Sequence, residues 1–198
     1  ELFKASKFSL LEIENTKIKT VNSHIEVDQW MQTGEPGVYA IGDLVGPPWL
    51  AHKASHEAVL CVERIAGIAE THSLNTDNIP ACTYCRPQVA SIGMTEEGAK
   101  KNGLQVRVGR FSFKANGKAL SLGETDGLVK TIFDANSGEL LGAHLVGAEV
   151  TELIHGFSIA KTLETTEADL LRTVFPHPTL SEMVHESVLD AYDKAIHI

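Results

Sequence analysis

The 198-residue sequence is poor in cysteine, in aromatic residues and in long apolar runs. Its three cysteines are too few, and odd in number, for a framework of disulfide bonds. No run approaches the roughly 20 apolar residues that a membrane-spanning helix needs. The first residues also lack the basic and then apolar pattern of a secretion signal. We therefore expect an intracellular protein that has no membrane as a partner.

Positive charge is scarce as well. Lys and Arg number 17 against 26 Asp and Glu, which gives a net charge of −9. Nucleic acids and anionic membranes are bound through clustered Lys and Arg, which this sequence spreads thinly, so no nucleic-acid partner is expected. A small molecule or another protein is the expected partner. Hydrophobic residues make up 43% of the chain, enough for one good core or two small ones.

Two of the cysteines, Cys82 and Cys85, form a C-x-x-C, a pattern found in redox and zinc sites. The segment 79–87 has an extended pattern, and residues three apart on a strand point to opposite faces. A zinc site would also need a second ligand pair, and none occurs at a typical spacing. We expect two structural thiols here. Cys61, in an apolar helical pattern, is expected in a core.

Two histidine pairs also raise the question of a metal site, namely His52 with His56, and His144 with His155. The first pair is one helical turn apart, but its members belong to different features, a possible ligand segment and an exposed helix face. The second pair has no cysteine or carboxylate at a spacing that completes a site. No metal site is predicted.

The first part of the chain combines short strands with one helix. Alternation over 18–27 predicts strands, and the apolar run 38–41 predicts a buried parallel strand that ends at Gly42-Asp43. Apolar residues then recur every three or four positions over 50–65, which predicts an amphipathic helix that Gly67 stops. The polar stretch 70–78 is a plausible domain boundary.

The rest of the chain predicts an α+β unit. Strands are expected over 84–92, 105–113, 128–134 and 140–146, with a loop around Asn116-Gly117 and a hairpin at 135–138. Helices are expected over 95–103, 149–163, 167–174 and 179–192. Strands with hairpins followed by grouped helices indicate an antiparallel sheet with the helices on one face.

The first motif that could carry chemistry spans 38–54, from V-Y-A-I-G-D to P-P-W-L-A-H-K-A. A strand end presents the carboxylate of Asp43, a glycine permits close approach of a ligand, and a helix begins a few residues later. The positive end of that helix suits an electron-rich or anionic group, and a reduced flavin fits this description. Taken alone, Gly42-Asp43 could equally be the end of a strand before a loop.

The whole string resembles the pyridine nucleotide–disulfide oxidoreductases, in which a Y-A-I-G-D strand and an L-A-H-K-A helix start form the second half of the FAD site. The resemblance implies that Asp43 accepts hydrogen bonds from the ribityl chain of FAD. It also implies that four residues lie with their backbone along the flavin: Trp49, Leu50, Ala51 and His52. Lys53 is expected to face solvent or a neighbouring carboxylate.

The second motif is F-P-H-P-T-L-S-E at 175–182. Thr179 and Glu182 have the T-x-x-E spacing of a capping box, so the motif could simply start a helix. The same geometry would bring Glu182 back towards His177. A carboxylate that binds one imidazole nitrogen fixes the tautomer, raises the basicity of the ring and leaves the other nitrogen free to take a proton. Such a histidine can activate a thiol for attack on a disulfide.

This second string resembles the H-P-T-x-S-E motif of the dihydrolipoamide dehydrogenase branch of the family, rather than that of glutathione reductases. The resemblance implies that His177 is the general base towards dihydrolipoamide, that Glu182 is its partner, and that the His177–Pro178 peptide is cis. In that family the histidine serves the active site of the other subunit. Further segments agree, at 84–93, 113–116, 126–130 and 142–147.

The resemblance implies a remnant of the FAD-binding α/β domain at 1–77 and an interface, or dimerisation, domain at 78–198. It implies an oxidoreductase, a dihydrolipoamide dehydrogenase, that uses FAD and NAD, works as a homodimer and serves the lipoyl domains of 2-oxo acid dehydrogenase complexes. Such an enzyme is cytoplasmic in bacteria and lies in the mitochondrial matrix of eukaryotes.

Three parts of such an enzyme have no counterpart in the sequence. These are the G-x-G-x-x-G turn for the FAD pyrophosphate, the redox cysteine pair and the second dinucleotide fold for NAD. We therefore expect the 198 residues alone to bind FAD weakly or not at all and to be catalytically inactive. Two alternatives remain open, a non-catalytic dimerisation module and part of a related disulfide reductase of the glutathione or mercuric reductase type.

Overall fold

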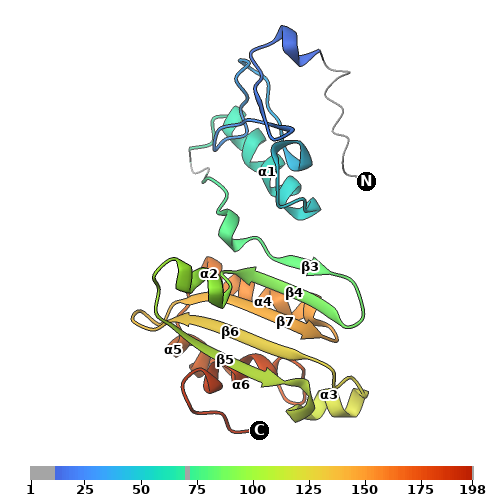
Figure 1. The fold of residues 1–198 in the computed structure, drawn as a ribbon, viewed down its shortest axis with the longest axis vertical. Coiled ribbons are helices and arrows are strands. Elements are labelled where there is room, and N and C mark those ends of the chain that lie inside the picture. Colours follow the sequence, from blue (N-terminus) through green and yellow to red (C-terminus); the bar gives the residue numbers. More distant parts are fainter. Residues whose placement is uncertain (1–11, 70–71, 198) are drawn as a thin grey trace. The chain divides into compact units, whose positions relative to one another are not determined.

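The computed structural model describes residues 12–69 and 72–197, and the chain divides into two compact units, Glu1–Asn75 and Thr76–Ile198 (Figure 1). Each unit has a hydrophobic core of its own. Within the described residues, no helix is both long enough and apolar enough to cross a membrane.

Within residues 12–69, the first unit contains two short strands, two 3-10 helices and one α-helix. They are η2 (Ile13–Asn15), β1 (Thr20–Val21), β2 (His24–Ile25), η3 (Gly42–Val45) and α1 (Ala51–Ile65). β1 and β2 pair antiparallel, so the strands predicted over 18–27 are confirmed. α1 buries Leu60 and Cys61 against Met31, which confirms the predicted amphipathic helix and the core position of Cys61.

The buried parallel strand predicted over 38–41 is wrong. In the described residues this segment makes only one antiparallel bridge, between Gln32 and Tyr39. Ala40 is buried, but Val38 is 39% exposed. A run of apolar residues becomes a parallel strand only beside neighbouring strands, and no such neighbour pairs with this segment within 12–69.

A five-stranded antiparallel sheet of order β3-β4-β7-β6-β5 is the framework of the second unit (Figure 1). Its strands are β3 (Ala81–Thr83), β4 (Gln88–Gly93), β5 (Val106–Ser112), β6 (Leu128–Asp134) and β7 (Leu140–Gly147). The predicted hairpin at 135–138 joins β6 to β7. The strand predicted over 84–92 begins only at Gln88, because Pro87 has no N–H for a ladder, and β3 precedes it.

The helices of the second unit are η4 (Thr76–Asn78), α2 (Glu96–Lys101), η5 (Phe113–Ala115), α3 (Gly117–Leu122), α4 (Val150–Thr162), α5 (Glu167–Arg172) and α6 (Glu182–Asp190). The loop predicted around Asn116-Gly117 is wrong. Asn116 instead caps α3, since its side chain accepts a hydrogen bond from the Ala119 N–H.

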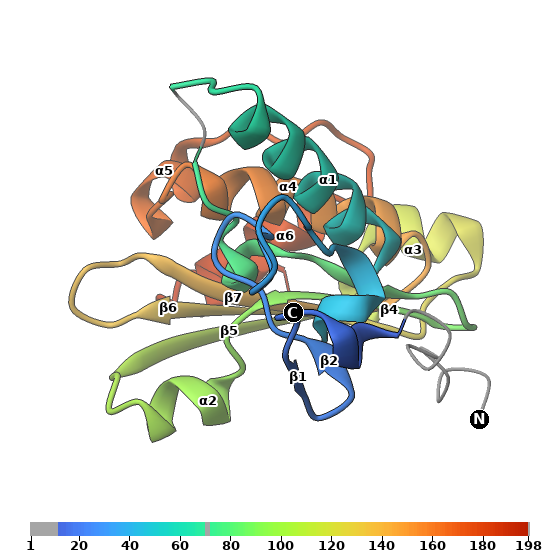
Figure 2. The ribbon, with the colours of Figure 1, turned by 90° about the horizontal axis from the view of Figure 1, so that it is seen from above.

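The sequence pattern predicted that the helices cover one face of the sheet, and this prediction is wrong for α2. α4 and α6 pack on one face, whereas α2 lies on the other (Figure 2). Ala99 of α2 is buried against Ile132 and Leu141, whose neighbours along β6 and β7 point to the opposite side. The α+β fold class predicted from the sequence is confirmed, with this change in the placement of α2.

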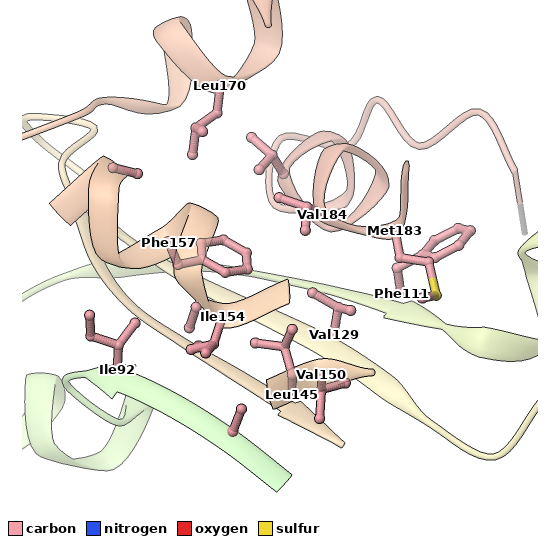
Figure 3. Packing of buried hydrophobic residues seen from close by; sticks show 14 of the residues in the cluster. Ile92, Phe111, Val129, Leu145, Val150, Ile154, Phe157, Leu170, Met183 and Val184 are labelled. Carbon is pink, nitrogen blue, oxygen red and sulfur yellow. The ribbon is translucent and has the colours of Figure 1, made fainter. Parts of the chain in front are cut away.

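The main core lies between the sheet and the two helices α4 and α6 (Figure 3). Val150, Ile154 and Phe157 point from α4 towards the strands, and Met183 and Val184 do so from α6. The strands contribute Ala90, Ile92, Phe111, Val129, Phe133, Ala143 and Leu145. Each large side chain buried here stabilises the fold by roughly 1.5–3 kcal/mol. This core fixes α6, and with it the position of Glu182 at the first turn of that helix.

On the face of the sheet that carries α2, the carboxylate of Glu96 forms ion pairs with three cations. Its carboxylate lies 2.7 Å from Lys100 Nζ, 2.7 Å from Lys130 Nζ and 2.9 Å from an Arg110 nitrogen. Hydrogen bonds from Lys100 and then Lys130 lower the pKa of Glu96 from 4.5 to about 2. Because the pKa is lower in the folded state, this carboxylate stabilises the fold above about pH 4.5 and loses that effect as the pH falls towards 2.

The substitution Glu96→Gln is expected to lower the free energy of unfolding by about 1–2 kcal/mol at pH 7, because it leaves three cations without their shared anion. The deficit relative to wild type should shrink as the pH falls below about 4.5, because the unfolded chain then binds a proton at Glu96 that the folded protein, with a pKa of about 2, does not. Urea unfolding of both proteins at pH 7 and pH 3 measures this. A deficit that stays constant between the two pH values would contradict the assignment.

Candidate active site

His177 and Glu182 meet at the start of α6. His177 lies in the loop between α5 and α6, and its Nδ1 is 2.9 Å from Oε1 of Glu182. The other carboxylate oxygen accepts a hydrogen bond of 2.8 Å from the Thr179 N–H. The His177 side chain is 79% exposed and that of Glu182 only 30%. The carboxylate is thus fixed at both oxygens, whereas the imidazole reaches into solvent.

Glu182 is held in its ionised form. The backbone N–H of Thr179, and to a lesser degree His177, lowers the pKa of Glu182 below its ordinary value of 4.5. An ionised carboxylate at Nδ1 keeps the proton of a neutral imidazole on that nitrogen, so Nε2 carries the lone pair. The pair can therefore accept a proton at Nε2 from a group outside this chain.

The capping box predicted for Thr179 and Glu182 forms only in part. Glu182 does accept from the Thr179 N–H, but the N-cap of α6 is Ser181. The Thr179 hydroxyl donates instead to the Pro176 carbonyl at 2.7 Å and lies 2.8 Å from the Ser181 hydroxyl. Helix α6 therefore starts three residues later than the spacing predicted. The His177–Pro178 peptide is cis, as the resemblance implied.

The five residues predicted to face FAD lie in the first unit, from η3 to the first turn of α1. Asp43 belongs to η3, and Leu50 is the N-cap of α1. Asp43, Ala51 and His52 are exposed, Trp49 is 55% exposed and Leu50 is half-buried. The carboxylate of Asp43 thus lies eight residues before Ala51, the first residue of α1, and the N-terminus of a helix favours an electron-rich or anionic group. These groups fit one side of an FAD site.

The sequence analysis did not predict that Lys53 and Glu57 form a buried ion pair in this segment. Lys53 Nζ lies 2.8 Å from a carboxylate oxygen of Glu57, and both side chains are at most 5% exposed. Lys53 also donates to the Gly46 carbonyl at 3.2 Å, and Glu57 accepts from the Gly42 N–H at 2.7 Å. The pair therefore ties both ends of η3 to α1. Lys53 was expected to face solvent or a neighbouring carboxylate, and it contacts a carboxylate. In the sequence, the only sign of this pair is the i, i+4 spacing.

Breaking this buried pair should destabilise the first unit strongly. The substitution Lys53→Met leaves Glu57 buried without its cation, so we expect a loss of about 3–5 kcal/mol in the free energy of unfolding. Both tryptophans of the chain, Trp30 and Trp49, belong to the first unit, so urea unfolding followed by tryptophan fluorescence measures its stability.

The exposed pair Lys101–Glu97, with side chains 74% and 79% exposed, supplies a control of the same spacing. Lys101→Met should change stability by less than about 1 kcal/mol, followed by circular dichroism. If Lys53→Met had as small an effect, the account of how η3 is held would be wrong.

The cysteines of the C-x-x-C motif have separate surroundings. Cys82 is half-buried beside the main core, and burial is the main cause that raises the pKa of its thiol. Cys85 is exposed, and its sulfur lies 3.0 Å from the Pro87 carbonyl oxygen. Both are free thiols. Among residues 12–69 and 72–197 no group of three metal-binding side chains occurs.

Two family models match the chain. The dimerisation domain of the pyridine nucleotide-disulphide oxidoreductases matches residues 79–188, and the pyridine nucleotide-disulphide oxidoreductase model matches residues 5–58. With the antiparallel α+β unit and the histidine–glutamate pair, these matches define the class: the chain belongs to the pyridine nucleotide-disulphide oxidoreductase family.

Within this family, curated relatives of the chain include dihydrolipoyl dehydrogenases. The chain is 58% identical to that of Zymomonas mobilis over 93% of its own length and 40% of the relative's. It is 46% identical to that of Bacillus subtilis, covering 93% of this chain and 39% of the relative. The chain thus spans about 40% of the length of the curated relatives it matches.

Solved structures agree with the fold. LpdA from Mycobacterium tuberculosis matches 92% of this chain and 40% of its own with a TM-score of 0.85 and 23% identity. The copper(II) complex of RclA, a flavoprotein disulfide reductase from Escherichia coli, matches 92% of this chain and 42% of its own with a TM-score of 0.83 and 23% identity.

Proposed function

We propose that this chain is the carboxyl-terminal part of a dihydrolipoyl dehydrogenase, and that His177 is the base which deprotonates dihydrolipoamide. The observation that carries this proposal is the 2.9 Å contact between His177 Nδ1 and Glu182, which leaves Nε2 on an imidazole that is 79% exposed. In this proposal residues 1–77 are part of the FAD-binding domain, and residues 78–198 form the dimerisation domain.

The proposed chemistry moves one electron pair and two protons from dihydrolipoamide to the redox disulfide of the enzyme. His177 Nε2 takes the proton of a dihydrolipoamide thiol, and the resulting thiolate attacks the redox disulfide of the enzyme. The attack forms a mixed disulfide and releases one enzyme thiolate. The second thiol of the substrate passes its proton to that enzyme thiolate and attacks the mixed disulfide, which closes the lipoamide ring and releases the other enzyme sulfur as a thiolate. His177, now protonated, is stabilised by Glu182 until it returns the proton to a leaving thiolate.

FAD, when bound, supplies the route by which the electron pair passes from the enzyme dithiol to NAD. Asp43 would hold the ribityl chain, and the backbone from Trp49 to His52 would lie along the flavin. Lys53 and Glu57 would keep Asp43 in place by fixing η3 on α1. By themselves the 198 residues are proposed to bind FAD weakly or not at all, because they contain no G-x-G-x-x-G turn for the pyrophosphate.

The proposed partners are a second copy of the chain and the lipoyl domains of 2-oxo acid dehydrogenase complexes. The match to a dimerisation domain over 79–188 supports the homodimer. Relatives from bacteria and from pea mitochondria support a cytoplasmic or a matrix location.

A chimera tests the proposed function. In it, this chain replaces the matching segment of the Zymomonas mobilis relative, which is 58% identical to it. The chimera should contain FAD and reduce NAD with dihydrolipoamide, and it should have far lower activity towards glutathione disulfide. Preference for glutathione disulfide would favour a glutathione reductase origin, and a folded, flavin-containing chimera with no turnover would favour a non-catalytic dimerisation module.

A further inference from the structure

The loop that carries His177 is anchored by a residue far away in the sequence. Asn116, at the N-terminus of α3, is only 5% exposed. Its Nδ2 donates a hydrogen bond of 3.1 Å to the carbonyl of Thr179, which lies 63 residues later. A buried side-chain amide is costly unless both its donor and its acceptor are used, and here both are.

The acceptor half of the same side chain fixes Asn116 itself. Its Oδ1 accepts a hydrogen bond of 2.9 Å from the Ala119 N–H and thereby caps α3. The amide can reach Thr179 in only one orientation once this cap is formed. Asn116 thus connects two otherwise separate segments, the start of α3 and the loop before α6.

Thr179 connects Asn116 to the histidine–glutamate pair through hydrogen bonds. Its carbonyl accepts from Asn116, its N–H donates to Glu182 at 2.8 Å, and its hydroxyl donates to Pro176 at 2.7 Å. Glu182 in turn binds His177 Nδ1 at 2.9 Å. The carbonyl and the N–H of Thr179 belong to adjacent peptide groups, so a shift of this residue would also move the N–H that orients the Glu182 carboxylate, and with it the contact at His177 Nδ1.

We propose that Asn116 is a positioning residue for the His177–Glu182 pair, acting through Thr179. The importance of this role for catalysis rests on the proposed function, in which His177 is the base. The effect of Asn116 on the His177 tautomer can be measured without turnover. Asparagine suits the position because it combines a cap acceptor with an amide donor in one short side chain. Aspartate supplies the acceptor alone when ionised, and serine has a shorter side chain.

The substitution Asn116→Asp separates the two roles of the side chain. It keeps the oxygen that caps α3, and at neutral pH it replaces the donor towards Thr179 by a second oxygen. We expect the ratio of the Nδ1–H to the Nε2–H tautomer of neutral His177 to fall by at least about threefold. Complete loss of a charge-assisted hydrogen bond would change this ratio roughly tenfold, and the variant weakens the contact only in part. Nitrogen-15 NMR of the labelled 198-residue chain measures the tautomer ratio. His177→Gln assigns the His177 signal among nine histidines.

Two further variants make the test decisive. Asn116→Ser also keeps a cap acceptor, loses the amide and should shift the tautomer in the same direction, which covers the case in which the aspartate variant does not fold. Thr95→Ala removes the corresponding cap of α2, where Thr95 Oγ1 accepts from the Gly98 N–H at 3.0 Å, and should leave the tautomer unchanged. Folded Asn116 variants with a wild-type tautomer ratio would overturn the proposal. So would an equal shift in Thr95→Ala. Because the readout needs neither FAD nor substrate, its failure is distinguishable from failure of the proposed enzyme activity.

Discussion

Replacing His177 by glutamine in the chimera is expected to lower kcat/KM for dihydrolipoamide by roughly 10²- to 10⁴-fold, the usual contribution of a general base. Glutamine can still hydrogen-bond to Glu182, but it has no nitrogen that takes up a proton near neutral pH. Initial rates of NAD reduction measure the effect. The flavin absorbance and the dimer mass should remain unchanged, since His177 contributes nothing to the core of its own chain and glutamine keeps the contact with Glu182.

His155 provides the matched control, because it is an exposed histidine on α4 with no carboxylate pairing among the described contacts. His155→Gln should leave the rate within about twofold of the parent, as expected for the substitution of an exposed side chain with no proposed role in the reaction. Equal rates for His177→Gln and His155→Gln would remove His177 from the mechanism.

Adding one methyl group at Gly109 of β5 is expected to cost about 3 kcal/mol or more in the free energy of unfolding. A Cβ at this position would overlap the Ser187 carbonyl oxygen and lie 2.8 Å from the Ala191 nitrogen. Both atoms belong to the backbone at the end of α6, and Ser187 O already accepts from the Thr131 hydroxyl at 3.2 Å. Neither strand nor helix can move aside without loss of core contacts, so Gly109→Ala should lower the urea midpoint.

Gly156 offers the opposite result from the same substitution. It lies in the middle of α4, is exposed, and would have nothing within 4 Å of an added Cβ. Alanine there should stabilise the helix by about 0.5–1 kcal/mol, because glycine loses more backbone entropy on folding. Circular dichroism during urea unfolding compares the two variants. Equal stability of Gly109→Ala and wild type would show that β5 and α6 are not packed as closely as described.

The periodicity of the sequence was enough to predict most of the second unit. β6 occupies the predicted residues 128–134, and α4 lies within the predicted 149–163, because alternation and helical spacing there agree with the burial pattern. Asn116-Gly117 was misread because both residues also favour turns. In the structure Asn116 caps α3 and also donates a hydrogen bond to the Thr179 carbonyl. That second contact joins residues far apart in the sequence, so no local pattern predicts it.

The site was predictable only where a motif carried it. The string F-P-H-P-T-L-S-E led to the contact between His177 and Glu182. The buried pair of Lys53 and Glu57 was not predicted, since charged residues at an i, i+4 spacing are usually solvated. The apolar run at 38–41 was misleading, because whether such a run becomes a strand depends on neighbours outside its own sequence.

Mixed dimers of the chimera test most directly whether His177 of one subunit serves the active site of its partner, as the family resemblance implies. One parent carries His177→Gln and the other lacks its redox cysteine pair, so each alone should be nearly inactive. After unfolding and refolding of an equal mixture, random pairing should restore about a quarter of the unsubstituted activity, because half of the dimers then contain one intact site built from both chains. If the mixture were as inactive as the two parents, with mixed dimers shown to be present, His177 could not act across the subunit interface.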